Sequence, residues 1–507
     1  MNKFIKIRIS SAGAGQNLAA YLARSGYFVH ADCGGKGKCG KCRVKLCSGV
    51  LFDNPECTHV SQPDAHGWYL ACRVYGGHGA TVLLPEQEGD GLTDFAGQNL
   101  QGASSSADLG IALDIGTTTL AMALVDIESG SVLATTSALN PQKSYGADVI
   151  SRIDAVMQHP EALLQMQQLL LDTVRDMMRE LLRTKTAHRM VVAGNPTMLH
   201  VFCGISPVSM GSYPFTPVFT DAKTLPGREL NLPVQSVTLL PSISAFVGGD
   251  VTAGMLHTRL CAQEQPCILL DVGTNGEIVL FTGTAFGSRL YATSAAAGPA
   301  MEGAGISTGM GGVRGAVCAF RMQNGKPLYS TVGDAPAKGI CGSGLIDLVA
   351  ALYQANELDE TGAFERGEQY VYATDEKGAP LSLLQSDVRA LQLAKSAIRA
   401  CIDAICAHAN LLPHQISRVF LAGGLGYYMN VDSAAAIGLF PAEIKQAVHS
   451  VGNAALGGCV QVLANPDLIG ALQSTLSQCQ TLELSTNAVW NQSFMENMMF
   501  PCKEDET

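Results

Sequence analysis

Six of the sixteen cysteines in this 507-residue chain lie in its first 72 residues, and four of the six are spaced like the ligands of a metal–sulfur site. Cys33, Cys39 and Cys42 form the pattern C-x5-C-x2-C, and Cys72 follows 30 residues after Cys42. A tight loop with three thiolates, joined by a fourth from a distant strand end, can surround an iron–sulfur cluster. The glycines between these cysteines let backbone N–H groups approach the sulfides and stabilise their negative charge. We therefore predict that these four cysteines bind such a cluster.

The loop between the first two cysteines indicates the type of cluster. It is one residue longer than the C-x4-C-x2-C loop of plant-type ferredoxins, and it resembles the loop of [2Fe–2S] ferredoxins with a C-x5-C-x2-C spacing. A zinc site is the alternative, but zinc sites usually pair two C-x2-C knuckles, and Cys72 has no such neighbour. Cys47 and Cys57 fit neither pattern, and we expect both to be ordinary buried thiols.

Two other segments repeat an aspartate, a glycine and a threonine in the same order, with their aspartates 157 residues apart: DIGTTT at 114–119 and DVGTNGE at 271–277. A glycine in such a turn lets N–H groups and threonine hydroxyls approach a phosphate, and the aspartate can position Mg²⁺ or water. Two matching loops suit a nucleotide held between two lobes. The predicted catalytic residues are the carboxylates Asp114, Asp271 and Glu277. The predicted phosphate contacts are Gly116, Thr117, Thr118, Thr119, Gly273, Thr274, Asn275 and Gly276.

A glycine-rich segment near the C-terminus is a candidate for the other end of the same nucleotide. FLAGGLG at 420–426 has the pattern of a strand that runs into a turn. Close backbone approach at Gly423, Gly424 and Gly426 would suit an adenosine and its α-phosphate. The alternative is that these glycines only allow close packing of a strand and a helix.

Two further segments have alternatives that the sequence leaves open. Gly342 and Ser343 begin an apolar helix and either contact a phosphate or form a hinge between lobes. Glu302 and Ser307, in the glycine-rich stretch 298–312, either face a protein partner or lie near the nucleotide. The chain has no GxxxxGK[ST] motif and no GxGxxG after a strand, so a P-loop and a Rossmann NAD site are excluded.

The elements that must position these residues follow an α/β pattern from residue 109 onward. Short apolar runs that end in glycine predict buried strands: IALDIG, MVVAG, CILLDVG and RVFLAGG. Apolar residues at helical spacing predict helices over 161–183 and 387–408. The segment 110–130 resembles the segment 267–287 in its strand, Asp-x-Gly-Thr loop and second strand. This repeat predicts a duplicated α/β fold with a cleft between two lobes.

Charge is unevenly distributed along the chain. The net charge is −11, but residues 1–84 carry ten Lys/Arg and four acids, a net +6 that leaves −17 for the remainder. The acidic total speaks against non-specific nucleic-acid binding, because phosphate contacts need Lys and Arg. The N-terminal MNKFIKIRIS alternates apolar and basic residues like a strand rather than a signal peptide, and no apolar stretch reaches about 18 residues. We expect a cytoplasmic chain that contacts neither nucleic acid nor membrane.

A change in composition separates the cysteine-rich region from the α/β pattern. The segment PEQEGDGLTDFAGQNLQGASSSAD at 85–108 is rich in Gly, Ser, Gln and acids, which predicts a flexible linker over 86–108. We therefore divide the chain into a domain at 1–85, this linker, and a two-lobed domain at 109–507. The lobes are expected at about 109–265 and 266–507.

Duplicated Asp-x-Gly-Thr loops with a late Gly-Gly-x-Gly turn resemble the ASKHA superfamily of ATPases, which includes acetate and sugar kinases, Hsp70 and actin. With the cysteine-rich N-terminal region, nearly the whole chain is similar to the reductive activators of corrinoid proteins. The similar blocks are ALDIGTTT (112–119), NPQKSYGADVISRI (140–153), AGNPTMLH (193–200), FVGGDVTAG (246–254), DVGTNGEI (271–278), AAGPAMEGAGISTGM (296–310), GICGSGLID (339–347) and LAGGLGYYMN (421–430). Minor departures are Met301, Cys341 and Leu425. The resemblance implies a β-grasp-like [2Fe–2S] ferredoxin domain followed by a two-lobed ATPase domain that binds ATP and Mg²⁺.

The resemblance also implies an activity and partners. The activity is one-electron reduction of inactive Co(II) to Co(I) in the corrinoid protein of a methyltransferase system, driven by ATP, with electrons from an upstream low-potential donor. The resemblance does not decide whether the chain forms a homodimer. We see no room before the first lobe for the extra middle domain of longer members, so their dimer interface cannot be carried over. An ATP-dependent electron donor to a radical dehydratase and a small-metabolite kinase with a fused ferredoxin domain are the alternatives. A ferredoxin with a non-catalytic body is disfavoured by the two intact phosphate loops.

Overall fold

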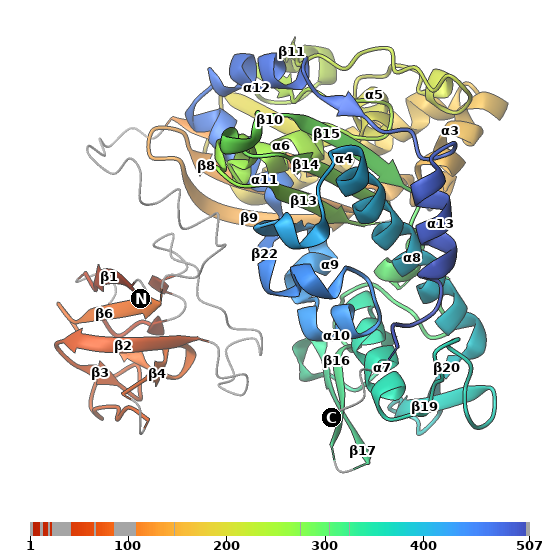
Figure 1. The fold of residues 1–507 in the computed structure, drawn as a ribbon. Coiled ribbons are helices and arrows are strands. Elements are labelled where there is room, and N and C mark those ends of the chain that lie inside the picture. Colours follow the sequence, from red (N-terminus) through yellow and green to blue (C-terminus); the bar gives the residue numbers. More distant parts are fainter. Residues whose placement is uncertain are drawn as a thin grey trace. The chain divides into compact units, whose positions relative to one another are not determined.

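The computed structural model describes residues 4–10, 14–18, 21–22, 42–64, 67–85, 108–146, 148–273, 275–303, 305–323 and 325–502. The chain forms two compact units, Met1–Gly102 and Ala103–Thr507 (Figure 1). The predicted linker lies outside the described residues except for Asp108. Among the described helices, none has the length and the hydropathy that crossing a membrane would require.

The first unit contains a four-stranded antiparallel sheet in the order β1-β6-β2-β4. Its strands are β1 (Phe4–Arg8), β2 (Arg43–Ser48), β4 (Tyr69–Leu70) and β6 (Thr81–Pro85), and β3 (Leu51–Phe52) pairs separately with β5 (Tyr75–Gly76). The predicted N-terminal strand is confirmed: Ile7 and Ile9 are buried, whereas Lys6 and Arg8 are exposed. This alternation places the apolar face of β1 on a small core that also contains Cys42.

The second unit contains two six-stranded sheets with the same central arrangement. The first has the order β11-β12-β10-β7-β8-β9, and the second has the order β22-β21-β13-β14-β15-β23. In the first, β7 pairs antiparallel with β8 and parallel with β10; in the second, β13 pairs antiparallel with β14 and parallel with β21. Asp114 and Asp271 occupy equivalent places near the ends of β7 and β13. The duplicated α/β fold predicted from the repeat is therefore confirmed.

The bounds of these strands are β7 (Leu109–Ile115), β8 (Thr119–Asp126), β9 (Ser131–Leu139), β10 (Arg189–Gly194), β11 (Lys223–Pro226), β12 (Ser236–Leu239), β13 (Cys267–Val272), β14 (Gly276–Phe281), β15 (Leu290–Ala295), β21 (Arg418–Ala422), β22 (Val448–Gly452) and β23 (Gln480–Thr481). Two smaller sheets contain β16 (Ala316–Gln323), β17 (Lys326–Thr331), β18 (Gly339–Ile340), β19 (Gln369–Thr374) and β20 (Pro380–Leu384). The helices are α3 (Val149–Gln158), α4 (Ala162–Leu182), α5 (Pro196–Phe202), α6 (Gly249–His257), α7 (Gly342–Gln354), α8 (Gln385–His408), α9 (Gly423–Tyr428), α10 (Val431–Ala436), α11 (Ala454–Ala464), α12 (Leu468–Leu476) and α13 (Ala488–Glu496).

The two long helices predicted from apolar spacing are α4 and α8, and both are confirmed within a few residues of the predicted bounds. α4 buries Met166, Leu170 and Val174 along one face, as the spacing requires. α8 buries its predicted apolar positions and lies in the core of the second lobe, next to β14 and β15. These helices hold the two sheets in place behind the loops that follow β7 and β13.

Helices α6 and α11 lie together between the two sheets. α11 comes late in the sequence, yet its Cys459 and Leu463 pack with Ala112 of β7 in the core of the first lobe. The two helices approach so closely that a β-carbon at Gly458 would lie 2.1 Å from the carbonyl oxygen of Ala253. The first lobe is therefore completed by a segment from the C-terminal part of the chain.

Candidate functional site

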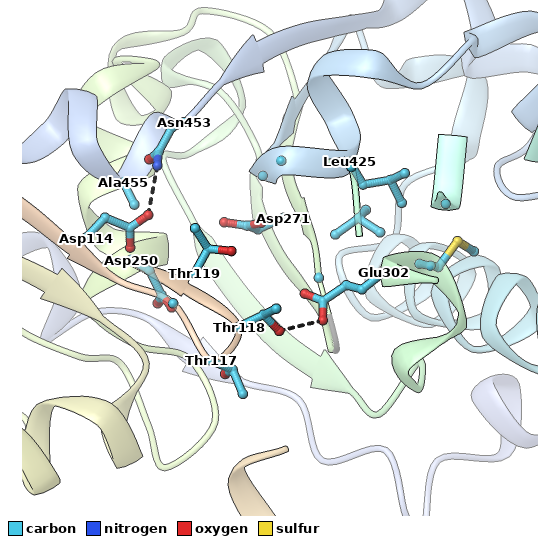
Figure 2. Close-up of a pocket in the computed structure, with 18 of the residues that line it drawn as sticks. Asp114, Thr117, Thr118, Thr119, Asp250, Asp271, Glu302, Leu425, Asn453 and Ala455 are labelled. Atoms are coloured by element: carbon cyan, nitrogen blue, oxygen red, sulfur yellow. Dashed lines mark hydrogen bonds between the residues drawn. The ribbon is translucent and has the colours of Figure 1, made fainter. Parts of the chain in front are cut away.

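A cavity of about 380 Å³ opens where the loops that follow β7 and β13 face each other (Figure 2). This size is within the range of small-molecule sites. The predicted site residues that line it are Asp114, Gly116, Thr117, Thr118, Thr119, Asp271, Gly273, Asn275, Glu277, Gly342, Ser343, Gly423 and Gly424. The structure thus brings together residues from four separate sequence motifs.

Of the three remaining predicted contacts, two fall outside what the structure describes and one has a packing role. Thr274 lies outside the described residues. The surroundings of Gly426, in α9, also lie outside what the structure describes. Gly276 faces the other way: a β-carbon there would lie 3.0 Å from Cγ1 of Ile398. This glycine lets α8 approach β14, which is a packing role.

The loop between β7 and β8 is closed by a hydrogen bond that only a glycine allows. The Gly116 N–H donates to the Thr119 carbonyl oxygen at 3.0 Å. A β-carbon at Gly116 would lie 2.6 Å from that same oxygen, which is too close for any other residue. The tight turn that results places the side chains of Thr117, Thr118 and Thr119 on the cavity wall.

Glu302 and Ser307, for which the sequence left two alternatives, lie in different surroundings. The Thr118 hydroxyl donates to Glu302 Oε2 at 2.9 Å, so Glu302 lines the cavity from the second lobe (Figure 2). Ser307 does not line it: its N–H and its hydroxyl both donate to Oδ1 of the buried Asp387, each at 2.9 Å. Asp387 therefore fixes the loop that carries Glu302.

Five partly buried carboxylates line the cavity, and burial raises the pKa of Asp114, Asp250, Asp271 and Glu277. Burial raises the pKa of Asp114 to about 7, a value that includes a lowering by the hydrogen bond from Asn453 and a raising by the charge of Asp250. Burial also raises the pKa of Asp271 to about 7 and that of Asp250 to about 6. The pKa of Glu277 is well above its ordinary range because of burial and the charges of Asp250 and Asp271.

This donor set fits Mg²⁺. Carboxylate oxygens are the ligands that this hard cation prefers, and a divalent ion would offset the repulsion that raises these pKa values. Among the described residues that line the cavity there is no lysine or arginine. A bound polyphosphate would therefore need a divalent cation for its charge.

Asp250 and two asparagines that line the cavity were missed by the sequence reasoning. Asn195 caps α5 and donates to the Thr117 hydroxyl oxygen at 3.0 Å. Asn453 caps α11 and donates to Asp114 Oδ2 at 2.8 Å (Figure 2). The signal for both was an asparagine placed directly before a helix, at the end of a strand. The signal for Asp250 was the first turn of α6, after two glycines.

The turn that follows β21 packs against the end of β13. Gly423 has φ +88°, a conformation that favours glycine, and a β-carbon there would lie 2.6 Å from Asp271 Oδ1. Gly423 and Gly424 therefore bring bare backbone to the cavity. The three departures from the family pattern, Met301, Cys341 and Leu425, also line it.

Two of the four predicted cluster ligands, Cys42 and Cys72, are among the described residues of the first unit. Cys42 and Cys72 are both buried, and their sulfur atoms lie 3.2 Å apart. This separation is well beyond a disulfide bond. The pair is a donor set that suits a thiolate-bound metal centre, and Cys33 and Cys39 lie outside the described residues.

The other two cysteines of this region were wrongly expected to be buried. Cys47 is exposed, and Cys57 is only partly buried. Cys47 stands on the solvent side of β2, because side chains alternate between the two faces of a strand.

Family models match most of the chain. A 2Fe-2S iron-sulfur cluster binding domain matches residues 6–75, the RACo middle region matches 109–263, and the C-terminal domain of RACo, the ASKHA domain, matches 265–507. The middle region falls on the first lobe itself. The expectation that the chain has no room for a middle domain before the first lobe is corrected accordingly.

Three proteins show the likeness over most of their length. Corrinoid activation enzyme RamQ of Eubacterium limosum is 32% identical over 471 residues, which cover 87% of this chain and 78% of that protein. A [Co(II) methylated amine-specific corrinoid protein] reductase of Methanosarcina barkeri is 26% identical over 68% of each protein. The solved structure of a reductive activator for corrinoid, iron-sulfur protein is 28% identical, with a TM-score of 0.72 over 98% of this chain and 96% of that one.

Proposed function

Because this chain belongs to the family of reductive activators of corrinoid proteins, we propose that it reduces the inactive Co(II) form of a corrinoid protein to Co(I) at the expense of ATP. The observation that carries the proposal is the presence in one chain of both parts of a coupled reduction. One part is the buried thiol pair Cys42 and Cys72, and the other is a carboxylate-lined cavity between two matching loops.

The electron balance is simple. An upstream low-potential donor gives one electron, and cobalt in the partner protein takes up one electron as Co(II) becomes Co(I). Cys33, Cys39, Cys42 and Cys72 would hold the [2Fe–2S] cluster, which supplies a one-electron carrier when bound. Cys42 and Cys72 are both buried, so their side chains are largely shielded from water.

The cavity residues would bind Mg²⁺ and ATP. The turn of Thr117 and Thr118 and its counterpart at Gly273 and Asn275 would contact the phosphates from the two lobes. Asp114 and Asp271 would hold Mg²⁺ or its water, and Glu277 would orient the water that attacks the terminal phosphate. The bare backbone at Gly423 and Gly424 would lie against the adenosine and its α-phosphate.

The geometry also supports a means of coupling. The bond from Thr118 to Glu302 joins the first lobe to the second, and that from Asn453 to Asp114 ties the start of α11 to β7. A phosphate that binds to Thr118 competes with Glu302 for the same hydroxyl. Nucleotide binding would thereby change the contacts between the lobes, and a partner that prefers one arrangement would be bound or released.

The test is a reduction assay with the full-length protein and its cluster reconstituted. The protein is mixed with an electron donor, Mg²⁺, ATP and a Co(II) corrinoid protein, and the visible spectrum is followed for Co(I). We expect Co(I) only when both ATP and this chain are present, and we expect none with the Cys42→Ser variant. Absence of Co(I) with several corrinoid proteins, together with phosphorylation of a metabolite, would refute the proposal in favour of a kinase.

A further inference from the structure

The segment 140–153, similar to the family but without an assigned role, lies directly behind the phosphate loop of the first lobe. It includes Asn140, Gln142 and Arg152, whose side chains are 1%, 0% and 1% exposed. Arg152 is among the largest fully buried side chains of the described residues. Burying a guanidinium costs free energy unless its N–H donors are hydrogen-bonded, so the partners of Arg152 determine whether it can be buried here.

The contacts of this segment fix the backbone carbonyls of the loop. Asn140 Nδ2 donates to the Gly116 oxygen at 2.9 Å, and Arg152 Nη2 donates to the Thr117 oxygen at 2.6 Å. The Asn140 N–H donates to the Thr118 oxygen at 2.9 Å. Three successive carbonyl groups are thus held on the side away from the cavity.

Fixing these carbonyls also orients the N–H groups of the loop. In a trans peptide the N–H of the next residue points opposite to the carbonyl. With the Gly116 and Thr117 oxygens turned toward Asn140 and Arg152, the N–H groups of Thr117 and Thr118 point the other way. These two residues line the cavity, so their N–H groups are prepared to meet an anion.

The remaining donors of Arg152 also meet neutral acceptors, including Met198 Sδ, to which Nη1 donates at 3.2 Å. Arg152 Nε donates to the Gly146 carbonyl at 3.1 Å and its Nη1 donates to Gln142 Oε1 at 3.2 Å. Gln142 in turn donates its N–H to Asn140 Oδ1 at 3.0 Å. The negative charges of Asp148 and Glu302 also act on the Arg152 guanidinium, and that of Glu302 comes from the cavity wall.

The positive charge of Arg152 lies next to a cavity lined by carboxylates. Five carboxylates and no lysine or arginine are among the described residues that line the cavity, and Arg152 stands one hydrogen bond behind the phosphate loop. We propose that Arg152, together with Asn140, is the positioning residue of the phosphate loop, and that its buried charge supplies the positive potential that the cavity wall lacks. The inference rests on the proposed binding of ATP.

The test compares three variants of the full-length protein with a matched control. Arg152→Met keeps the bulk but removes charge and donors, Arg152→Lys keeps the charge with fewer donors, and Asn140→Ala removes the bond to Gly116. The control is Arg175→Met, because Arg175 also donates to a backbone carbonyl, that of Asn231 at 3.3 Å, but does not contact the loop. Binding of Mg²⁺-ATP and Mg²⁺-ADP is measured by calorimetry, together with ATPase kinetics and thermal unfolding.

We expect Arg152→Met to weaken Mg²⁺-ATP binding by about 10- to 100-fold, the effect of losing a charged hydrogen bond in a buried site. KM should rise by the same factor with kcat within about threefold, because the loop grips the phosphates before and during the reaction. The KM of Arg152→Lys should lie between those of Arg152→Met and the wild type. Asn140→Ala should raise KM, and Arg175→Met should leave KM unchanged.

Two results would overturn the inference and leave the proposed function standing. One is wild-type affinity and KM in folded Arg152→Met and Asn140→Ala variants. The other is loss of the folded state in all three variants, which would show that the network holds the lobe rather than the loop. If the wild-type protein itself bound no Mg²⁺-ATP, both the inference and the proposed function would be wrong.

Discussion

Replacing Asp114 with Asn should stabilise the nucleotide-free protein at neutral and alkaline pH, even though it damages the site. Burial raises the pKa of Asp114 from its ordinary 3.8 to about 7, so the folded chain holds this carboxylate unfavourably once it is charged. Asn removes the charge and keeps an oxygen that can accept the bond from Asn453. The substitution therefore removes the unfavourable buried charge and keeps the hydrogen bond from Asn453.

The sign of the pH dependence follows from the direction of the shift. Below about pH 4 the carboxyl is protonated in both the folded and the unfolded chain, and the variant gains little. Between pH 4 and 7 the unfolded chain releases the proton and the folded chain keeps it, so the wild type loses stability as pH rises. Above pH 7 the deficit is constant, and there the gain of the variant is largest.

The size of the gain has an upper limit. A shift from 3.8 to about 7 corresponds to at most about 4 kcal/mol at roughly 1.4 kcal/mol per pH unit. Because Asp114 is only partly buried and faces the cavity, screening by water should leave about half of this, ~2 kcal/mol. For a cooperative unit of roughly 400 residues, that is a rise of about 2–3 °C in Tm.

The assay is thermal unfolding of the wild type and the variant at pH 4.5 and pH 8, without nucleotide or Mg²⁺ and then with both. We expect a clearly larger rise in Tm for Asp114→Asn at pH 8 than at pH 4.5, and loss of the further stabilisation that Mg²⁺ and ATP give the wild type. The control is Asp154→Asn, which changes an exposed carboxylate on α3. It should leave both the Tm and the stabilisation by Mg²⁺ and ATP unchanged. A lower Tm for Asp114→Asn at pH 8, or equal shifts at both pH values, would refute the reasoning.

Three further predictions concern the cluster, the turn after β21 and the charge of the N-terminal region. Cys42→Ser should abolish the visible absorption of the reconstituted cluster, whereas Cys47→Ser, at an exposed position, should leave the spectrum unchanged. Gly423→Ala should lower kcat/KM for ATP at least about tenfold, because φ is +88° and the new β-carbon would lie 2.6 Å from a carboxylate oxygen; Gly470→Ala, which meets open space, should keep the wild-type value. The rate of cobalt reduction should fall severalfold between about 50 and 300 mM salt, because residues 1–84 carry a net +6; a salt-independent rate would show that this charge takes no part in docking.

The parts of the site that the sequence reveals are those that its repeat makes visible. Asp114 and Asp271 could be recognised because the same strand, turn and strand occur twice, and each strand is buried and therefore apolar. Asp250 has no counterpart in the repeat. It lies on α6, whose place between the two sheets depends on close contact with α11, about 200 residues later. Contacts at that sequence distance leave no local pattern, and the acid after two glycines at the start of a helix does not reveal them.

Glycine is the residue for which the sequence is least informative. Gly116, Gly276 and Gly423 each stand where a side chain would clash, but with different neighbours: a carbonyl of its own turn, a side chain of α8, and the carboxylate of Asp271. Only the first and third bring backbone to the cavity. A glycine in a motif therefore predicts close approach, and only the fold decides whether a ligand or a helix is what approaches.

The distribution of charge around the cavity explains why its function should need a divalent cation and two lobes together. Asp114 and Asp271 stand on different lobes; the charge of Asp114 raises the pKa of Asp271, and the charge of Asp271 raises the pKa of Glu277. Bringing the lobes closer increases that repulsion unless a cation lies between them. Mg²⁺ that arrives with ATP would remove the cost, so the closed arrangement would be favoured only when the nucleotide is bound. Neutralising one carboxylate, as in Asp114→Asn, should therefore weaken the link between nucleotide and lobe closure while it stabilises the fold.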